Sequence, residues 1–421
     1  MRGAIAIVFA SGCFNPTYNN PACGPAGECP DGLVCNTSQQ CVRSNPDGGY
    51  TGDGFGPTDA FVIDAPAACL QWTPHFFSPC AIGSPNGPVT LMSGVYTYNT
   101  TLGTLIDSTN NQIAHSTFLL DQGGTPTWGM NVTNLVVQAG ATLRVVGTRP
   151  LIVAAWGTIE IDGVIDASSP TPATLGQVPS NGGAGADPGS CMASTGGDGQ
   201  FNINGSGGAG GGGFQGQGGL GGSLAQAAGG LHGTSVAMPH IVRGGCAGGA
   251  SGQGALAYGG LGGGAIQLTA QMMLTVNGTI QASGGGGEAG MPGKHAGGGG
   301  GGAGGFIGLE SSTLALVSGV VSANGGGGAS GSALGQGQNG QDGQASTSAA
   351  HGGQAPGCPT QFSGADGAAG ASLNGQNAMN NNNNNCTGGG GGGAVGYVFL
   401  FSNQIAPNTT TQSPQGLVNP F

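Results

Sequence analysis

The run Gly264-Ala265-Ile266-Gln267-Leu268 leads to Val276-Asn277-Gly278-Thr279-Ile280-Gln281-Ala282. The same template returns in the chain as Gly305-Phe306-Ile307-Gly308-Leu309, which leads to Val317-Ser318-Gly319-Val320-Val321-Ser322-Ala323. Ile266 and Ile307 are 41 residues apart, and so are Gly278 and Gly319. An internal repeat indicates a fold built by stacking one unit, in which each copy buries the face of its neighbour.

Further copies of the template lie on both sides of this pair. An earlier copy spans 151–167, and a half copy, Gly393-Ala394-Val395-Gly396-Tyr397-Val398, comes near the end of the chain. Within each copy the apolar residues alternate at period 2, which is typical of half-buried strands. Residues 135–161 add short β-branched runs broken by glycine. We therefore expect an all-β protein whose main architecture is a right-handed parallel β-helix, or solenoid.

Glycine tracts separate the strand motifs, at 181–264, 284–305, 325–375 and 386–393. Two stretches, 337–343 and 364–370, place glycine at every third position. That period suits polyglycine-II-like helices packed side by side, because such helices have three residues per turn. Ordering glycine costs more backbone entropy than ordering any other residue, so flexible surface loops are the alternative. The sequence leaves both interpretations open for these insertions into the solenoid.

Composition excludes several classes of protein. The chain has 421 residues, of which 96 are glycine and 24 proline, yet only 5% are charged, whereas disordered chains depend on charge for solvation. The formal net charge is -11, and the six Lys and Arg residues are scattered. Nucleic-acid binding needs clustered cations, so we expect no nucleic-acid partner. No apolar run reaches the roughly 20 residues that a membrane-spanning helix requires.

The amino terminus has the features of an export signal. Arg2 precedes the short apolar stretch 3–9, and Ala10-Ser11-Gly12-Cys13 then resembles the lipobox of bacterial lipoproteins, with Ala10 where leucine is usual. This resemblance implies cleavage before Cys13 and attachment of a lipid to its thiol, which would anchor the protein to a membrane. The alternative is an ordinary secretory signal, with Cys13 a structural thiol.

The cysteine count fits export. There are 11 cysteines, and setting Cys13 aside for lipid leaves ten, enough for five disulfides in an oxidising compartment. Cys69 and Cys80 are expected to pair locally, and the last four to tie glycine tracts together. A zinc site is disfavoured, because the first cysteines follow a C-x5-C spacing with no histidine nearby, and we predict no metal or cofactor. The disulfide candidates are Cys23, Cys29, Cys35, Cys41, Cys69, Cys80, Cys191, Cys246, Cys358 and Cys386.

These features divide the chain into five parts. Residues 1–12 are the predicted signal peptide, and 13–41 hold the lipid-anchor cysteine and a cysteine-rich module. That module resembles the small modules with a C-P-x-G-x-x-C core that follow the lipid anchor in many exported bacterial proteins. Residues 42–68 form a Gly-, Pro-, Asp- and Ser-rich linker, 69–169 a strand-rich start of the solenoid, and 170–421 its glycine-rich repeats.

Taken together, the chain resembles glycine-rich, PGRS-like bacterial surface lipoproteins. The resemblance rests on the Gly-Gly-x-Ile-x-Leu and Val-x-Gly-x-Ile-x-Ala-x-Gly-Gly patterns at 262–285 and 303–326, and it covers about 150–421. It implies a place on the bacterial cell envelope, at the outer-membrane surface or outside the cell. It also implies a structural or adhesive role, with polysaccharide, other surface proteins or further copies of the chain as candidate partners, and it brings no catalytic residue.

Catalytic chemistry has one candidate. Glu160, Asp162 and Asp166 alternate along a strand and its turn, which could place carboxylates ~6–7 Å apart, as in glycosidases. The alternative is an outward polar face, with Arg144 or Arg149 pairing with these acids. The histidines are isolated and suggest neither a catalytic triad nor a metal site: His75, His115, His232, His240, His295 and His351. We therefore predict a non-catalytic protein, with a β-helix lyase or glycoside hydrolase acting on polysaccharide as the alternative.

Overall fold

The computed structural model describes two compact units, residues 1–64 and 65–421. The described residues are 23–24, 28–29, 33–35, 41–43, 69, 71–121, 126–172, 175–176, 180, 182–252, 257–291, 293, 295–332, 336–358, 362–380, 386–406 and 409–420. The lipidation candidate Cys13 and the signal-peptide and linker segments lie outside these residues. No helix among the described residues is long and apolar enough to cross a membrane.

The first unit holds a small disulfide-linked hairpin. Strand β1 (Leu33–Cys35) pairs antiparallel with β2 (Cys41–Arg43). Disulfides join Cys23 to Cys35 and Cys29 to Cys41. Because so few residues cannot bury a core, such a module depends on these covalent links. The cysteines are oxidised, so the thiolates that zinc would need are absent from this cluster.

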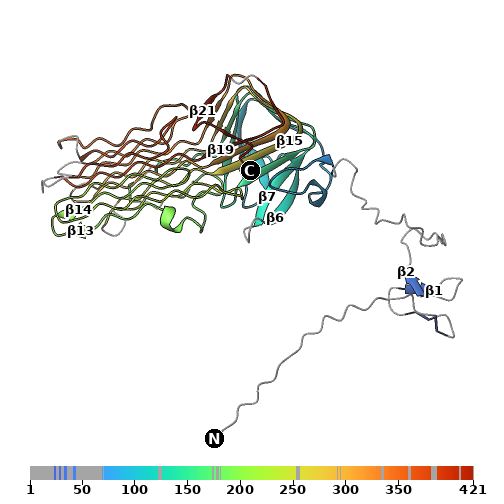
Figure 1. Cartoon of the computed structure of the whole chain (residues 1–421), viewed down its shortest axis with the longest axis horizontal. Helices are drawn as coiled ribbons and strands as arrows, with labels where there is room; N and C mark the ends of the chain where they lie inside the picture. The colour runs from blue at the N-terminus through green and yellow to red at the C-terminus, as the bar shows by residue number, and fades with distance from the viewer. Residues whose placement is uncertain are drawn as a thin grey trace, which may run out of the picture. The chain divides into compact units, whose positions relative to one another are not determined.

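Two mixed sheets form the body of the second unit (Figure 1). The larger sheet follows the order β22-β19-β17-β15-β10-β7-β6, with β3, β8, β11 and β20 attached; the smaller follows β21-β18-β16-β12-β9-β4-β5. The strands of the larger sheet are β3 (Val89–Leu91), β6 (Ser116–Asp121), β7 (Pro126–Val132), β8 (Leu135–Val137), β10 (Leu151–Ala155), β11 (Thr158–Ile161), β15 (Ala265–Val276), β17 (Phe306–Leu316), β19 (Tyr397–Phe401), β20 (Gln404–Ile405) and β22 (Leu417–Val418). The strands of the smaller sheet are β4 (Gly94–Asn99), β5 (Thr104–Asp107), β9 (Ala141–Val146), β12 (Val164–Asp166), β16 (Thr279–Gln281), β18 (Val320–Ser322) and β21 (Thr411–Ser413).

The remaining elements are short. A two-stranded sheet pairs β13 (Phe201–Asn202) with β14 (Gly205–Ser206). The 3-10 turns are η2 (Pro79–Ala81) and η3 (Met192–Ser194), and the described residues contain no α-helix. The all-β prediction is therefore confirmed.

The repeat in the sequence is the stacking register of the sheets. Strand β15 lies parallel to β17 with Ile266 opposite Ile307, and β10 lies on the other side of β15 with Leu151 opposite Ile266. The half copy continues the stack, since Val398 of β19 lies opposite Ile307. The inward residues of both sheets form one apolar core. That core includes Leu143, Val153, Leu268, Ile280, Leu309, Val321 and Leu400.

The predicted right-handed parallel β-helix is wrong. The sheets are mixed, since β6 pairs antiparallel with β7 and β5 antiparallel with β4. They also curl partly around the core. The stacked strands are also separated by long excursions: between β12 and β15 the chain leaves the sheets for almost a hundred residues. A period-2 pattern specifies where strands form, but it does not specify the path of the chain between them. The solenoid labels for 69–169 and 170–421 are wrong for the same reason.

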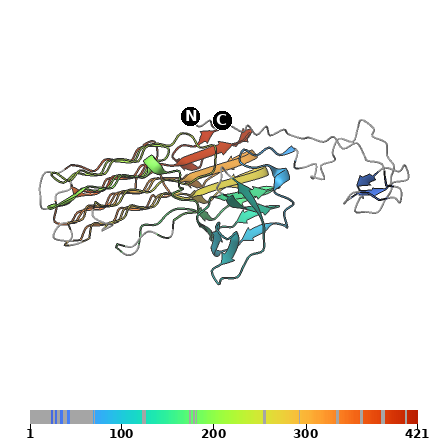
Figure 2. The same ribbon diagram turned by 90° about the horizontal axis from the view of Figure 1, so that it is seen from below.

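The glycine tracts form a separate layer, which we call the glycine array (residues 194–252, 257–264, 282–305, 323–380 and 387–396, where described). Figures 1 and 2 show these tracts running side by side away from the sheets and turning back at a common far end. Most of their described glycines are buried. Disulfides link two cysteines of the array, Cys246 and Cys358, to Cys191 and Cys386 just outside its ranges, while Cys69 pairs locally with Cys80.

Candidate functional site

The glycine array is held together by backbone hydrogen bonds whose direction rotates with a period of three. The amides of Gly298, Gly299 and Gly300 donate to three different tracts, and the amide of Gly301 returns to the first of them. The acceptors are the carbonyl oxygens of Gly388, Glu288, Gly249 and Gly391, at 2.9, 2.9, 3.1 and 2.9 Å. Three residues per turn is the periodicity of polyproline-II-type helices, which have no internal hydrogen bonds and must pair with neighbours.

The same tract also accepts bonds from three further tracts. The carbonyl oxygen of Gly298 accepts from Ala209, that of Gly299 from Ala329, and that of Gly300 from Gly260. The central tract 296–305 is thus hydrogen-bonded to six others. Buried backbone groups must find partners, and here distant tracts supply them without any strand ladder.

Glycine is required because the tracts lie so close together. A Cβ atom on Gly300 would lie 1.9 Å from the carbonyl oxygen of Gly210, and one on Gly298 would lie 2.0 Å from that of Ala329. Contacts this short do not occur, so any side chain would push two backbones apart. The glycine-rich composition is therefore a packing requirement, and close Cα–H···O contacts accompany it.

Asparagine and aspartate close the edges of the array. The Oδ1 atoms of Asn374, Asn377 and Asn380 accept hydrogen bonds from three amides of a neighbouring tract, those of Gln217, Leu220 and Ser223, at 2.9, 2.8 and 3.0 Å. In the same way Asn339 accepts from Ala289 and Asp342 from Gly286, at 2.8 and 2.9 Å. The period of three places each side chain on the same side of its tract, where it takes the place of a missing backbone carbonyl.

The turns at the far end of the array gather into one surface, the array tip (described residues 201–206, 224–227, 291, 293, 295, 355–358 and 386). The amide of Ser206 donates to the carbonyl of His295 at 3.0 Å, and Leu224 forms a bridge with Ala227. Figure 1 places β13 and β14 at this end. Ile203, in the turn between these two strands, is 96% exposed. Short turns on a hydrogen-bonded support are the usual arrangement of recognition loops.

A second feature lies on the outer face of the larger sheet. Along β15, Ile266 and Leu268 point into the core, so Gln267 and Thr269 point outward. Thr269 lies opposite Glu310 of β17, and Glu310 opposite Phe401 of β19. This face is buried beneath residues 69–82, whose Trp72, Phe76, Phe77 and Ile82 pack against aromatic residues of the sheet.

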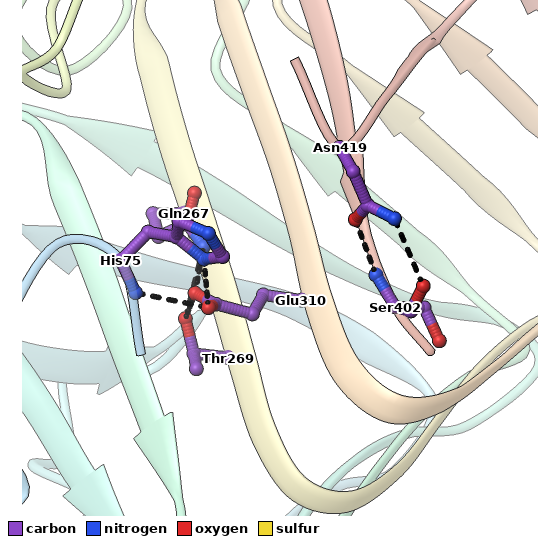
Figure 3. A network of polar contacts seen from close by, with 6 residues as sticks. All are labelled: His75, Gln267, Thr269, Glu310, Ser402 and Asn419. Atoms are coloured by element: carbon purple, nitrogen blue, oxygen red, sulfur yellow. Dashed lines mark hydrogen bonds and ion pairs between the residues drawn. The ribbon is translucent and has the colours of Figure 1, made fainter. Parts of the chain in front are cut away.

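Glu310 is the centre of a polar network on this face, drawn in Figure 3. Its Oε1 accepts hydrogen bonds from the backbone amide and the Nδ1 atom of His75, at 2.9 and 2.6 Å. Its Oε2 accepts from Gln267 Nε2 and Thr269 Oγ1, both at 3.2 Å. The carboxylate side chain is only 8% exposed, whereas that of His75 is 36% exposed and stacks on Phe401, with ring centroids 4.1 Å apart. Burial raises the pKa of Glu310, and the bonds from His75 and Thr269 oppose that shift.

The network opens into a hollow of about 220 Å³. It lies where β15, β17 and the chain after β19 bend, so its wall is built from the corners of stacked strands. Asn419 exchanges hydrogen bonds with the backbone of Ser402 at this wall, at 3.1 and 3.2 Å. We call this hollow the His75 pocket; its lining is Gln71, Trp72, Thr73, His75, Ala270, Gln271, Glu310, Ser311, Ser312, Phe401, Ser402, Asn403 and Asn419.

A larger hollow of about 450 Å³ lies elsewhere on the second unit, lined by Asn86, Gly87, Pro88, Gln112, Ala114 and His115. His115 Nδ1 lies 2.9 Å from the carbonyl oxygen of Ile113, so that nitrogen is the donor. This lining contains no carboxylate and no aromatic wall, and it offers less chemistry than the His75 pocket.

Two of the three acids predicted from the sequence have structural partners of their own. Arg144 Nη1 lies 3.0 Å from Asp166 Oδ2, which is the ion pair considered as the alternative to catalysis. Asp162 Oδ1 accepts from Asn277 Nδ2 at 2.7 Å, and Glu160 is exposed on β11. The backbone carbonyl oxygen of Arg149 accepts a hydrogen bond from Thr100 Oγ1 at 2.6 Å.

The pairing of His75 with Glu310 was not predicted from the sequence. The two residues are 235 positions apart, and the repeat template specifies neither of them. His351 also lies near an acid, 3.6 Å from Asp366, but its side chain is 70% exposed. All ten disulfide candidates are paired, including the predicted Cys69–Cys80 link.

No known family, curated protein or solved structure matches this chain.

Proposed function

We propose that this chain is an exported, lipid-anchored protein of the bacterial envelope or extracellular space, with a structural or adhesive role and no catalytic activity. The observation that carries the proposal is the six-neighbour bonding of tract 296–305. An array whose central tract is hydrogen-bonded to six others cannot bend without breaking many bonds together. It is suited to hold the turns of the array tip at a constant geometry away from the sheets.

Two further features support export. The five disulfides are typical of proteins that mature in an oxidising compartment. The low charge content leaves amides, hydroxyls and scattered apolar side chains as the groups available for contact with a surface. Binding through many weak polar contacts favours extended ligands such as polysaccharides, other envelope proteins or further copies of the chain.

The enzyme alternative has less support. A glycoside hydrolase of the usual kind needs two carboxyl groups beside one bond. Among the described residues, the lining of the His75 pocket supplies one, Glu310. The acids predicted from the sequence, Glu160, Asp162 and Asp166, line neither hollow.

The test is to produce the full chain with its own amino terminus in a bacterium that has an outer membrane. We expect Cys13 to carry lipid by mass spectrometry, Cys13→Ser to abolish it, and whole cells to retain beads coated with polysaccharide or with the protein itself. Recovery of the chain in the cytoplasm with reduced cysteines would contradict export. A correctly exported protein that retains no bead of either kind would contradict the adhesive role.

A further inference from the structure

We propose that the His75 pocket binds one unit of a neutral saccharide. This site goes beyond the proposed adhesive role, because it lies on the sheets and not at the array tip. The first argument is that the pocket contains a buried acid. Burying a carboxylate is costly unless it is hydrogen-bonded, and four donors converge on Glu310: the amide and Nδ1 of His75, Gln267 Nε2 and Thr269 Oγ1.

The second argument is the chemistry of the lining. Apart from the His75–Glu310 pair it is neutral, and it contains no lysine or arginine. Gln71, Thr73 and Asn403 are exposed at the rim, while Trp72 and Phe401 are buried in the wall. The ring that a ligand can reach is the part-exposed imidazole of His75, which covers the face of Phe401. Amide and hydroxyl groups around this ring match a sugar ring, which has hydroxyls at its edge and C–H groups on its faces.

The third argument is charge. A protein with formal net charge -11 and a pocket without cations disfavours anionic ligands such as uronic acids or sulfated sugars. A cationic ligand gains little, because the Glu310 side chain is only 8% exposed and both of its oxygens already accept hydrogen bonds from the protein. A neutral polyol is the remaining small polar class, and the part-exposed imidazole is placed to hydrogen-bond with it.

The fourth argument is size. A hollow of about 220 Å³ takes one ring and not a chain. Its wall is formed by adjacent strand corners, at Ala270, Ser311 and Ser402. A saccharide chain would therefore enter by one terminal unit, with the rest of the chain outside the rim.

A structural role is the competing explanation for the pair, since the amide and ring of His75 also fasten residues 69–82 to the sheet. The two explanations differ at the rim. Gln71 and Asn403 are exposed, so replacing them by alanine leaves the buried network intact and alters only what a ligand would contact.

The experiment uses the full, non-reduced protein with glucose, galactose, mannose and N-acetylglucosamine, measured by saturation-transfer NMR and calorimetry. We expect at least one of these sugars to bind with a Kd on the order of 1 mM, and Gln71→Ala with Asn403→Ala to weaken it at least about tenfold. The Tm of that double variant should equal that of the parent. The matched control removes two exposed glutamines outside both the pocket and the array tip, Gln138→Ala with Gln376→Ala, and should bind like the parent.

Three outcomes would overturn the inference: no binding by any of the four sugars up to about 10 mM, equal binding by the rim variant, or stronger binding of glucuronate than of glucose. Loss of binding in the Gln138 and Gln376 control would place the sugar elsewhere and would also overturn it. Adhesion of whole cells depends on the array tip in the proposed function. A protein that adheres but binds no monosaccharide in the pocket would therefore contradict the saccharide inference and leave the proposed adhesive role standing.

Discussion

The Oδ1 atom of Asn377 accepts a hydrogen bond from the amide of Leu220 at 2.8 Å, across 157 residues of chain. Asn374 and Asn380 repeat this contact three residues before and after it, with the same separation in sequence. Two tracts that are remote in the chain are therefore fixed in one register by side chains that stand in for backbone carbonyls.

Replacing Asn374, Asn377 and Asn380 together by alanine should lower the free energy of unfolding by about 1–3 kcal/mol. The three amides are at an edge, so water replaces part of what is lost. The control is Gln376→Ala, an exposed residue of the same tract, which should stay within about 0.5 kcal/mol of the parent. Denaturant titration measures both, and a triple variant as stable as the control would show that the asparagines do not hold this edge.

Gly300→Ala should be among the most damaging substitutions in the chain. Its Cβ would lie 1.9 Å from the carbonyl oxygen of Gly210, so the tracts must separate and break paired bonds. We expect a loss above about 4 kcal/mol or failure to accumulate folded protein. Gly189→Ala is the matched control, because Gly189 is exposed and a Cβ there meets nothing within 4 Å. Thermal unfolding that is equally affected by both changes would argue against close packing of the array.

The array also predicts a pattern of hydrogen exchange. The amides of 298–305, 388 and 390–396 donate to other tracts and should exchange slowly, although these residues form no strand before β17 and β19 begin. Ala225 and Gln226, exposed in a turn of the array tip, should exchange fast. Mass spectrometry of the non-reduced protein measures both. Exchange of the glycine tracts at the rate of the tip turn would mean that they are not held by these bonds.

Much of the sheet region is predictable from the sequence. The 41-residue spacing of Ile266 and Ile307 predicts their stacking, because a period-2 pattern with a repeat leaves one register that buries every apolar residue. The route of the chain between strands is not predictable in this way, and the β-helix prediction was wrong on that account. Glycine tracts have no side-chain pattern that specifies their neighbours.

The His75 pocket shows a second limit of sequence reasoning. At equivalent template positions the outward residues are Thr269, Glu310 and Phe401, so no repeated residue marks the site. Its partner His75 comes from a segment with no repeat at all. The template does contain one signal. Glu310 is a carboxylate at a position where the sheet is buried on both faces, and a carboxylate there needs a hydrogen-bonding partner.

The Cys358–Cys386 disulfide lies in the array tip and joins cysteines 28 positions apart in the sequence. Replacing both cysteines by serine should lower the free energy of unfolding by about 2–4 kcal/mol, chiefly by enlarging the unfolded ensemble. The effect should be local in the folded state, with faster exchange in 355–358 and unchanged protection in β15 and β17. Loss of protection throughout the sheets would contradict a local role for this link.

Asp187 gives the fold a dependence on pH. Burial raises the pKa of its carboxyl to about 7, although the amide of Gly262 donates to it. Because this pKa lies above the unfolded value near 4, the folded state holds a proton that the unfolded state releases. The contribution of Asp187 is therefore fully present below pH 4 and is lost as the pH rises to 7, with a slope of at most about 1.4 kcal/mol per pH unit. Asp187→Asn should remove this slope, so that the stability of the variant relative to the parent grows between pH 4 and 7. Denaturant titrations across that range test it, and parallel curves for the two proteins would contradict a raised pKa at Asp187.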